Sequence, residues 1–434
     1  MSNQNFSLNF AAKICVFLCA ISLACAAEKS TPTTVNLERD ADGTYQQAIE
    51  SIEKERGAHD FALVEPAIGL GVNYQLQNQH DKAIEAFKQA LHVNRINRGL
   101  HDLDHIPIID LIAHSQMRLG DWEGAEQQQR LRFWIYQREI ETSTDVSAEL
   151  LNNYIDATLH LTAWQGKSFT KDTGRFPLVK LRQAQSALSD AKERLAAQSR
   201  TRDARYFRLL NAMAVNNYNI VVHLSDNEVD PVSGSYGGDQ DMSDYLLRQN
   251  IITDSYREGT SALEEIMTIT NSEAQGLEHA MAILNYADWQ ILFNRPQTAA
   301  KEYQRAHDAF IAAGIDKPQL DKRFAEPQRI SSFELSFGGQ PDDPDTIETA
   351  EPALKVRDSG PNTPFVLAVF DVTRKGEVRN VDIENSWPDN DRNIRRQTRN
   401  RLVSSKFRPA LLDGKPVVSK DVKIRYLFTN YGSN

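Results

Sequence analysis

The sequence predicts an α+β protein of more than one domain, in which an all-α solenoid is followed by a small ββαβ domain. Residues 44–315 are rich in helix-forming residues, and apolar residues recur three and four positions apart, which is the period of a helix that buries one face. After Pro364 the apolar period changes to two, as in half-buried strands, and one helical stretch interrupts it. We therefore expect a helical region over 44–315 and a second domain over 363–434.

The N-terminus is predicted to be a cleaved signal peptide covering residues 1–27. A polar start with one cation, Lys13, precedes an apolar run that ends in small residues, which is the order of an export signal. The run has about 13 residues, whereas a spanning helix needs roughly 20. We expect cleavage after Ala26 or Ala27 and a periplasmic protein. A lipoprotein cut before Cys25 and an uncleaved membrane anchor are the alternatives.

The positions of the cysteines and the distribution of charge exclude some kinds of site in the exported chain. Its cysteines, Cys15, Cys19 and Cys25, all lie in the leader, so cleavage removes disulfides, thiolate metal sites and cysteine nucleophiles. Residues 361–434 carry 14 Lys and Arg against 8 Asp and Glu, which gives this region a net charge of +6. Because the whole chain has a net charge of −10, residues 1–360 carry −16. An exported chain that is acidic overall does not favour nucleic-acid binding.

Two segments are predicted to lack a core of their own. Residues 28–43 form a polar, flexible lead, and residues 316–362 form an acidic, proline-containing linker. Such compositions bury too little apolar surface to fold alone. Residues 330–337 could add one strand, and we expect loops at Phe176–Pro177 and over 230–238, where Gly and Pro gather.

Within the helical region, small and large apolar residues alternate at the spacing of a helix pair, where a small residue lets two helices approach and large ones fill the space between them. These residues are Leu70, Gly71, Tyr74, Ala83, Phe87 and Ala90. They resemble the signature of a tetratricopeptide (TPR) repeat. Ala287, Ala299, Tyr303 and Ala306 resemble a late unit. The pattern degenerates over 142–270, and an irregular helical domain is the alternative.

The C-terminal region predicts strands over 365–372, 378–384 and 422–428, with a helix over 389–405 capped by Asp389 or Asn390. Gly376 and Gly414 permit the positive φ that tight turns demand. Phe407 is expected in the core, and Pro409 is expected to end the helical run. Three short motifs follow one another along this region: Gly376-Glu377-Val378, Phe407-Arg408-Pro409-Ala410 and Gly414-Lys415-Pro416-Val417. Together they resemble the C-terminal domain of TonB-family proteins.

The TonB resemblance implies contact with an extended segment of an outer-membrane transporter, added as a strand at a sheet edge. The expected edge is the last strand, consisting of Val422, Lys423, Ile424, Arg425, Tyr426, Leu427 and Phe428. The preceding helix is cationic through Arg392, Arg395, Arg396 and Arg399. Those arginines form either a solvated face or a docking surface for an acidic partner, such as the acidic parts of this chain.

The sequence therefore predicts a non-enzymatic adaptor in envelope transport or assembly, with an outer-membrane transporter or envelope complex as its partner. No spacing of acids and histidines singles out a catalytic pair. The cluster of His101, Asp102, Asp104 and His105 suggests a metal, but a loop of the extended TPR variant explains it, so we expect no metal, cofactor or small-molecule substrate. The rival is a TonB-type energy transducer, which needs a spanning helix containing a histidine. A structural role at the cell wall stays open.

Overall fold

A computed structural model of the chain describes residues 33–144, 146–165, 176–226, 240–271, 276–330, 365–389 and 391–427. Two compact units, Met1–Thr173 and Gly174–Asn434, make up the chain. The predicted signal peptide, the predicted loop over 230–238 and Phe428 lie outside the described residues. No described helix is both long enough and apolar enough to cross a bilayer.

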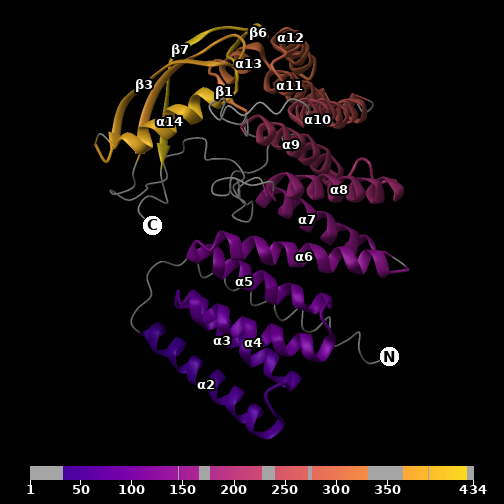
Figure 1. The fold of residues 1–434 in the computed structure, drawn as a ribbon, viewed down its shortest axis with the longest axis vertical. Coiled ribbons are helices and arrows are strands. Elements are labelled where there is room, and N and C mark those ends of the chain that lie inside the picture. The colour runs from indigo at the N-terminus through magenta and orange to yellow at the C-terminus, as the bar shows by residue number, and fades with distance from the viewer. Residues whose placement is uncertain are drawn as a thin grey trace. The chain divides into compact units, whose positions relative to one another are not determined.

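The first unit is a row of helices, each packed against the next along the chain (Figure 1). Local signals set their ends. Gly120 adopts a left-handed φ of 76° after α5, and the Asp121 side chain then caps α6 by accepting the Gly124 N–H at 2.9 Å. The helices are α2 (Thr33–Arg56), α3 (Val64–Leu76), α4 (His80–Arg98), α5 (Ile106–Leu119), α6 (Trp122–Thr142) and α7 (Ala148–Gln165), with 3-10 turns at Phe61–Leu63 and Leu103–His105.

The α3–α4 pair shows why small and large residues are spaced as they are. A Cβ on Gly71 would lie only 2.4 Å from the Phe87 ring, so glycine lets the two helices meet across that ring. Ala83, Phe87 and Ala90 are fully buried, and Leu70 is buried beside them. Tyr74 is half-buried, and its hydroxyl accepts a hydrogen bond from Gln46 Nε2 at 3.0 Å. These contacts place α3 and α4 in close packing at Gly71 and Phe87.

The second unit begins with helices that again pack each on the next (Figure 1). At its late helix pair, Ala287, Ala299, Tyr303 and Ala306 are all buried. The helices are α8 (Phe176–Ala197), α9 (Ala204–Asp226), α10 (Gln240–Asn271), α11 (Gly276–Leu292), α12 (Pro296–Ala312) and α13 (Lys317–Arg323).

The same unit ends in a small domain built on a three-stranded antiparallel sheet of order β3-β2-β7. Helix α14 packs on one face of this sheet. Buried and half-buried residues alternate along β2, because successive side chains of a strand point to opposite faces. Its core comprises Val366, Ala368, Phe370, Val372, Val378, Ile383, Ile394, Leu402, Phe407 and Tyr426. The elements are β2 (Phe365–Val372), β3 (Val378–Trp387), α14 (Arg392–Ser404), β4 (Phe407–Arg408), β5 (Leu411–Leu412), β6 (Lys415–Pro416) and β7 (Ser419–Leu427).

The structure confirms a helical region followed by a small antiparallel β domain. The expected positive φ occurs at Gly376 (73°) and Gly414 (74°), and Phe407 lies in the core. Strand β2 matches the predicted bounds, while β7 begins at Ser419, earlier than expected.

Several local predictions were wrong. The predicted lead is helical from Thr33, where α2 begins, and the Asp42 carboxylate accepts a hydrogen bond from Asn73 at 2.6 Å. Phe176 and Pro177 open α8 rather than forming a loop, which suits a proline that has no N–H to donate within the first turn. The predicted linker starts with ordered elements, α13 and the strand β1 (Gln328–Arg329).

The C-terminal helix also differs in detail from its prediction. Its N-cap is Asp391, whose carboxylate accepts the N–H groups of Asn393 and Ile394 at 2.7 and 3.3 Å. This register turns Ile394, Thr398 and Leu402 toward the sheet. The helix ends at Ser404, so Pro409 does not terminate it.

Candidate functional site

The last strand, β7, is an edge of the sheet. It pairs with β2 on one side, and no described strand pairs with its other side. Its pairing is irregular at its start: Asp421 has a φ of 55°, and its N–H is donated to the Asp371 carboxylate at 3.1 Å. The regular register with β2 runs from Val422 to Leu427, so a strand added there would meet an extended backbone.

Side chains of β7 divide between the two faces of the sheet. Val422, Ile424 and Tyr426 pack toward α14 and belong to the core or lie against it. Lys423 and Arg425 alternate with them and point to the other face. The side chain of Leu427 and all of Phe428 lie outside the described part of the chain. The seven predicted residues are therefore not equivalent, because the core residues offer a partner mainly their backbone.

The face opposite α14 is partly apolar and carries cations. Phe365, Leu367 and Val369 of β2 are half-buried on it. The Arg425 guanidinium lies over the Phe365 ring at 4.1 Å from its centroid. Lys423 Nζ lies 2.7 Å from Glu384 Oε1 across the sheet, in an exposed pair. A strand beside β7 would thus run next to two cationic side chains on this face.

The arginines of α14 are not all equally accessible. Arg392, Arg396 and Arg399 are exposed, at the helical spacing that places them on one side. Arg395 is half-buried, and its guanidinium donates to the Ile383 carbonyl at 3.3 Å. Three of the four predicted basic residues therefore face solvent, while Arg395 also fastens the helix to β3.

The small domain is held on the last helices through contacts that the sequence analysis did not predict. Arg408 of β4 donates to both carboxylate oxygens of Asp288 on α11, with Nε 3.0 Å from Oδ1, and Tyr303 of α12 donates to the same Oδ1 at 2.8 Å. The Asp288 side chain is 3% exposed, and the Arg408 side chain is 14% exposed. Burial and the neighbouring Asp288 carboxylate raise the pKa of Tyr303 well above its usual value.

Backbone contacts reinforce this docking. β1, which follows α13, pairs with β4, and the Leu411 N–H donates to the Phe324 carbonyl at 2.9 Å. Gly376 is needed where the β2–β3 turn meets β4, because a Cβ there would lie 2.1 Å from the Phe407 carbonyl oxygen. The motifs that resemble those of TonB-family proteins thus lie at or beside the contact with α11 and α12. Their residues there include Phe407, Pro409, Ala410, Gly414 and Pro416.

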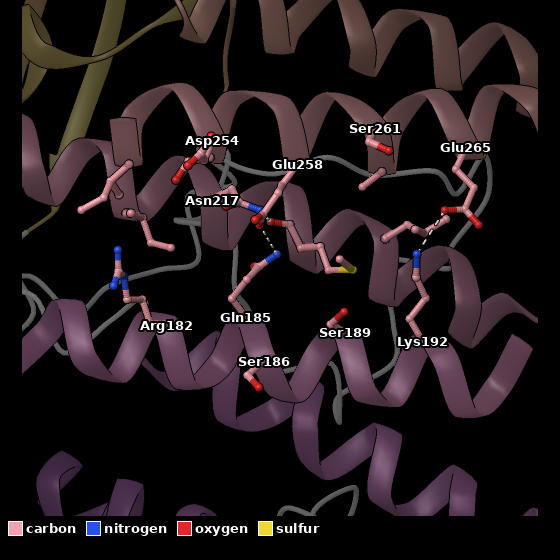
Figure 2. Close-up of a pocket in the computed structure, with 16 residues that line it drawn as sticks. Arg182, Gln185, Ser186, Ser189, Lys192, Asn217, Asp254, Glu258, Ser261 and Glu265 are labelled. Carbon is pink, nitrogen blue, oxygen red and sulfur yellow. Dashed lines mark hydrogen bonds and ion pairs between the residues drawn. The ribbon is translucent and has the colours of Figure 1, made fainter. Parts of the chain in front are cut away.

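A groove lies between α8 and α10, over α9, with a cavity volume of about 650 Å³ (Figure 2). Leu210, Met213 and Ile220 give it apolar walls. Its rim is polar, and two contacts span it: Gln185 Nε2 donates to Glu258 at 3.1 Å, and Lys192 Nζ lies 3.4 Å from Glu265 (Figure 2). A groove of this size can hold a few side chains of a bound peptide.

Besides its apolar walls, the groove is lined by charged and polar side chains. Neither histidine nor cysteine occurs among its described lining residues. Glu265 also accepts a hydrogen bond from the Tyr206 hydroxyl, and burial together with this carboxylate raises the pKa of Tyr206. Tyr206 of α9 and Lys192 of α8 thus both contact Glu265 of α10 at this end of the groove.

The His101-to-His105 cluster consists of residues with separate structural contacts. The Asp102 carboxylate accepts the Asp104 N–H at 2.8 Å, and Asp104 pairs with Arg98 at 2.8 Å. His105 is buried, its Nε2 lies 2.6 Å from the Gly99 carbonyl oxygen, and burial lowers its pKa. His101 packs edge-on against Trp134, with the ring centroids 4.3 Å apart.

Comparisons with known proteins do not assign a family. No protein-family model and no curated protein matches the sequence. Among solved structures, BtubC (BKLC) from P. vanneervenii is 16% identical over 65% of this chain and 94% of its own, with a TM-score of 0.34. A circular tandem repeat protein with a novel repeat topology is 12% identical over 64% of this chain and 66% of its own, with a TM-score of 0.29. Both scores are below 0.5, so neither likeness supports an argument about function.

Proposed function

We propose that this chain is an exported, non-enzymatic adaptor of the cell envelope, with a TPR-like solenoid and a TonB-like C-terminal domain. The domain docks an outer-membrane partner by accepting an extended segment at β7. The observation that carries the proposal is the edge position of β7, whose register from Val422 to Leu427 is regular on the β2 side and has no described strand on the other. Main-chain hydrogen bonds of an added strand supply affinity at such an edge.

The side chains beside this edge specify the partner segment. Residues of an added strand would alternate between the α14 side, next to Val422 and Ile424, and the opposite face, next to Lys423 and Arg425. Cross-strand neighbours favour apolar with apolar and acid with base. The segment that fits is therefore an extended one with apolar residues alternating with Asp or Glu.

The helical region has a second surface that can contribute binding. Solenoids present grooves to peptides and folded partners, and the α8–α10 groove combines apolar walls with a charged rim. In this proposal the solenoid holds one component of an envelope complex while the C-terminal domain engages another. No cofactor is required.

The docking test exchanges charge at the edge without removing the domain. In the double variant Lys423→Glu and Arg425→Glu, the acid-bearing strand would meet two carboxylates, which repel it. We expect retention of solubilised outer-membrane proteins by the immobilised variant to fall at least about tenfold. The matched control is Lys375→Glu in the exposed β2–β3 turn, which should retain them as the unmodified chain does. Equal retention by the edge variant would exclude β7 as the binding site.

Export is tested on the protein from its own host. N-terminal sequencing should find a chain that begins at Ala27 or Glu28, in the periplasmic fraction. An intact Met1 or Ser2 in the membrane fraction would contradict the adaptor and favour an energy transducer anchored by its N-terminus.

A further inference from the structure

A group of potential metal ligands lies where the small domain meets the last helices. His307 comes from α12, Asp321 from α13 and Asp413 from the β5–β6 turn. Each offers a ligand atom, and these atoms all lie within 4.8 Å of one another. The group lies outside the β7 edge and the α8–α10 groove, so the proposed function makes no use of it.

The imidazole of His307 has an unused nitrogen. The residue is 6% exposed, and its buried Nε2 has no hydrogen-bond partner among the described residues, while Nδ1 lies 3.5 Å from Asp308 Oδ1. Buried polar atoms are nearly always paired, and one that is not calls for an explanation such as an ion. A neutral imidazole nitrogen is a preferred ligand for divalent transition metals.

The β5–β6 turn is shaped to bring a carboxylate close to this ring. Asp413 and Gly414 both have positive φ, 48° and 74°. A Cβ on Gly414 would lie 2.8 Å from His307 Cβ, so the turn approaches α12 as closely as glycine allows. This approach places Asp413 beside His307, and Asp321 of α13 completes the group from a half-buried position.

We propose that His307, Asp321 and Asp413 form a binding site for a divalent transition-metal ion of the zinc type. One imidazole and two carboxylates are three protein ligands, a number that leaves a fourth tetrahedral position for water. The mixed nitrogen and oxygen set favours Zn²⁺ over Ca²⁺ or Mg²⁺, which prefer oxygen alone. Because the ligands come from α12, α13 and the small domain, the ion would fasten that domain to the helices.

Lys317 competes with the metal for Asp413. Its ammonium group pairs with the Asp413 carboxylate, and both side chains are more than half exposed. A cation already lies against the Asp413 carboxylate in this pair, at the position where a metal ion would bind. The ion must displace Lys317, so removing the lysine charge should strengthen metal binding.

The test is calorimetric titration with Zn²⁺ of the chain without its predicted signal peptide, residues 28–434, together with thermal unfolding. The unmodified chain should bind one Zn²⁺ and unfold at a higher temperature when Zn²⁺ is in excess. His307→Ala should weaken binding at least about tenfold and abolish the thermal shift. Lys317→Met should tighten binding about thirtyfold, since a unit charge about 4 Å from a divalent ion is removed in water.

The control is His92→Ala, which removes an exposed histidine whose ring lies 5.7 Å from that of His59, a pair that could bind zinc on the surface. This variant should bind Zn²⁺ as the unmodified chain does. Asp321→Asn, checked for helix content by circular dichroism, repeats the test if His307→Ala fails to fold, and it too should weaken binding about tenfold. The proposal is overturned if the unmodified chain binds no Zn²⁺, if His92→Ala alone removes binding, or if Lys317→Met weakens it.

Discussion

Arg408→Met removes the positive charge that neutralises the buried carboxylate of Asp288. In the native structure the guanidinium donates two hydrogen bonds to that carboxylate, and Tyr303 donates a third. Burial alone would lower the pKa of Arg408, but the Asp288 carboxylate reverses this and raises it. The variant therefore leaves an almost fully buried anion whose remaining donor, among the residues that the structure describes, is Tyr303.

The cost follows from breaking one side of a buried ion pair. Removing one partner of such a pair typically costs about 3–5 kcal/mol, because the remaining charge is desolvated without compensation. Here the remaining Tyr303 hydrogen bond and the slight exposure of Arg408 place the expected loss near 3 kcal/mol. Adding Asp288→Asn removes the stranded charge, so the double variant should recover about 1–2 kcal/mol.

The assay is a double-mutant cycle, with the free energy of unfolding measured by urea titration through Trp fluorescence and far-ultraviolet circular dichroism. We expect a coupling energy of about 2–3 kcal/mol between Arg408 and Asp288. The control cycle uses the exposed Glu377–Arg379 pair, which lies 3.3 Å apart and should couple by less than about 1 kcal/mol. A coupling below about 0.5 kcal/mol at Arg408 and Asp288 would refute the idea that this pair holds the domain in place.

Three further predictions concern stability. Gly71→Ala should destabilise the first unit by about 1–3 kcal/mol in urea titration because its Cβ would meet the Phe87 ring, whereas Gly43→Ala, with open space around it, should not. Gly376→Ala should cost more than 1 kcal/mol, combining a strained positive φ with a clash against the β4 backbone, and an unchanged urea midpoint would contradict this. Burial lowers the pKa of His105, so the unfolded state binds more protons, and stability of the first unit should fall as pH drops below about 6.5; a stability that does not change between pH 7.5 and 5.5 would refute this.

Elements with a strong local pattern could be predicted from the sequence. Strand β2 is apolar at every position except Asp371, and its bounds, Phe365 to Val372, match the predicted ones. Helix positions such as Gly71 and Phe87 were also predicted, because the repeat spacing encodes which residues must be small or large. The α14 start was missed since Asp389, Asn390 and Asp391 can all cap a helix, and only packing of Ile394 on the sheet selects Asp391.

The docking of the small domain could not be predicted from the sequence, because its partners are far apart along the chain. Arg408 and Asp288 are 120 residues apart, and nothing local connects them. A signal was present on each side: Asp288 interrupts an apolar helical run between Ala287 and Trp289, and Arg408 stands between Phe407 and Pro409. A charge inside an apolar segment indicates a buried partner, although it does not say which. His307 was missed for the same reason.

Because β1 pairs with β4, the small domain is joined to the helices by non-covalent contacts as well as by the chain between residues 330 and 365. Since β1, Phe324 and Asp288 all contact the small domain directly, we expect these contacts to hold the domain in place even when the chain is cut. A chain cut once within that connection would behave as two fragments held together like the subunits of a complex. Equally, at high concentration the small domain of one molecule could occupy the same contacts on a second, giving an exchanged dimer with each β4 on the other molecule's β1.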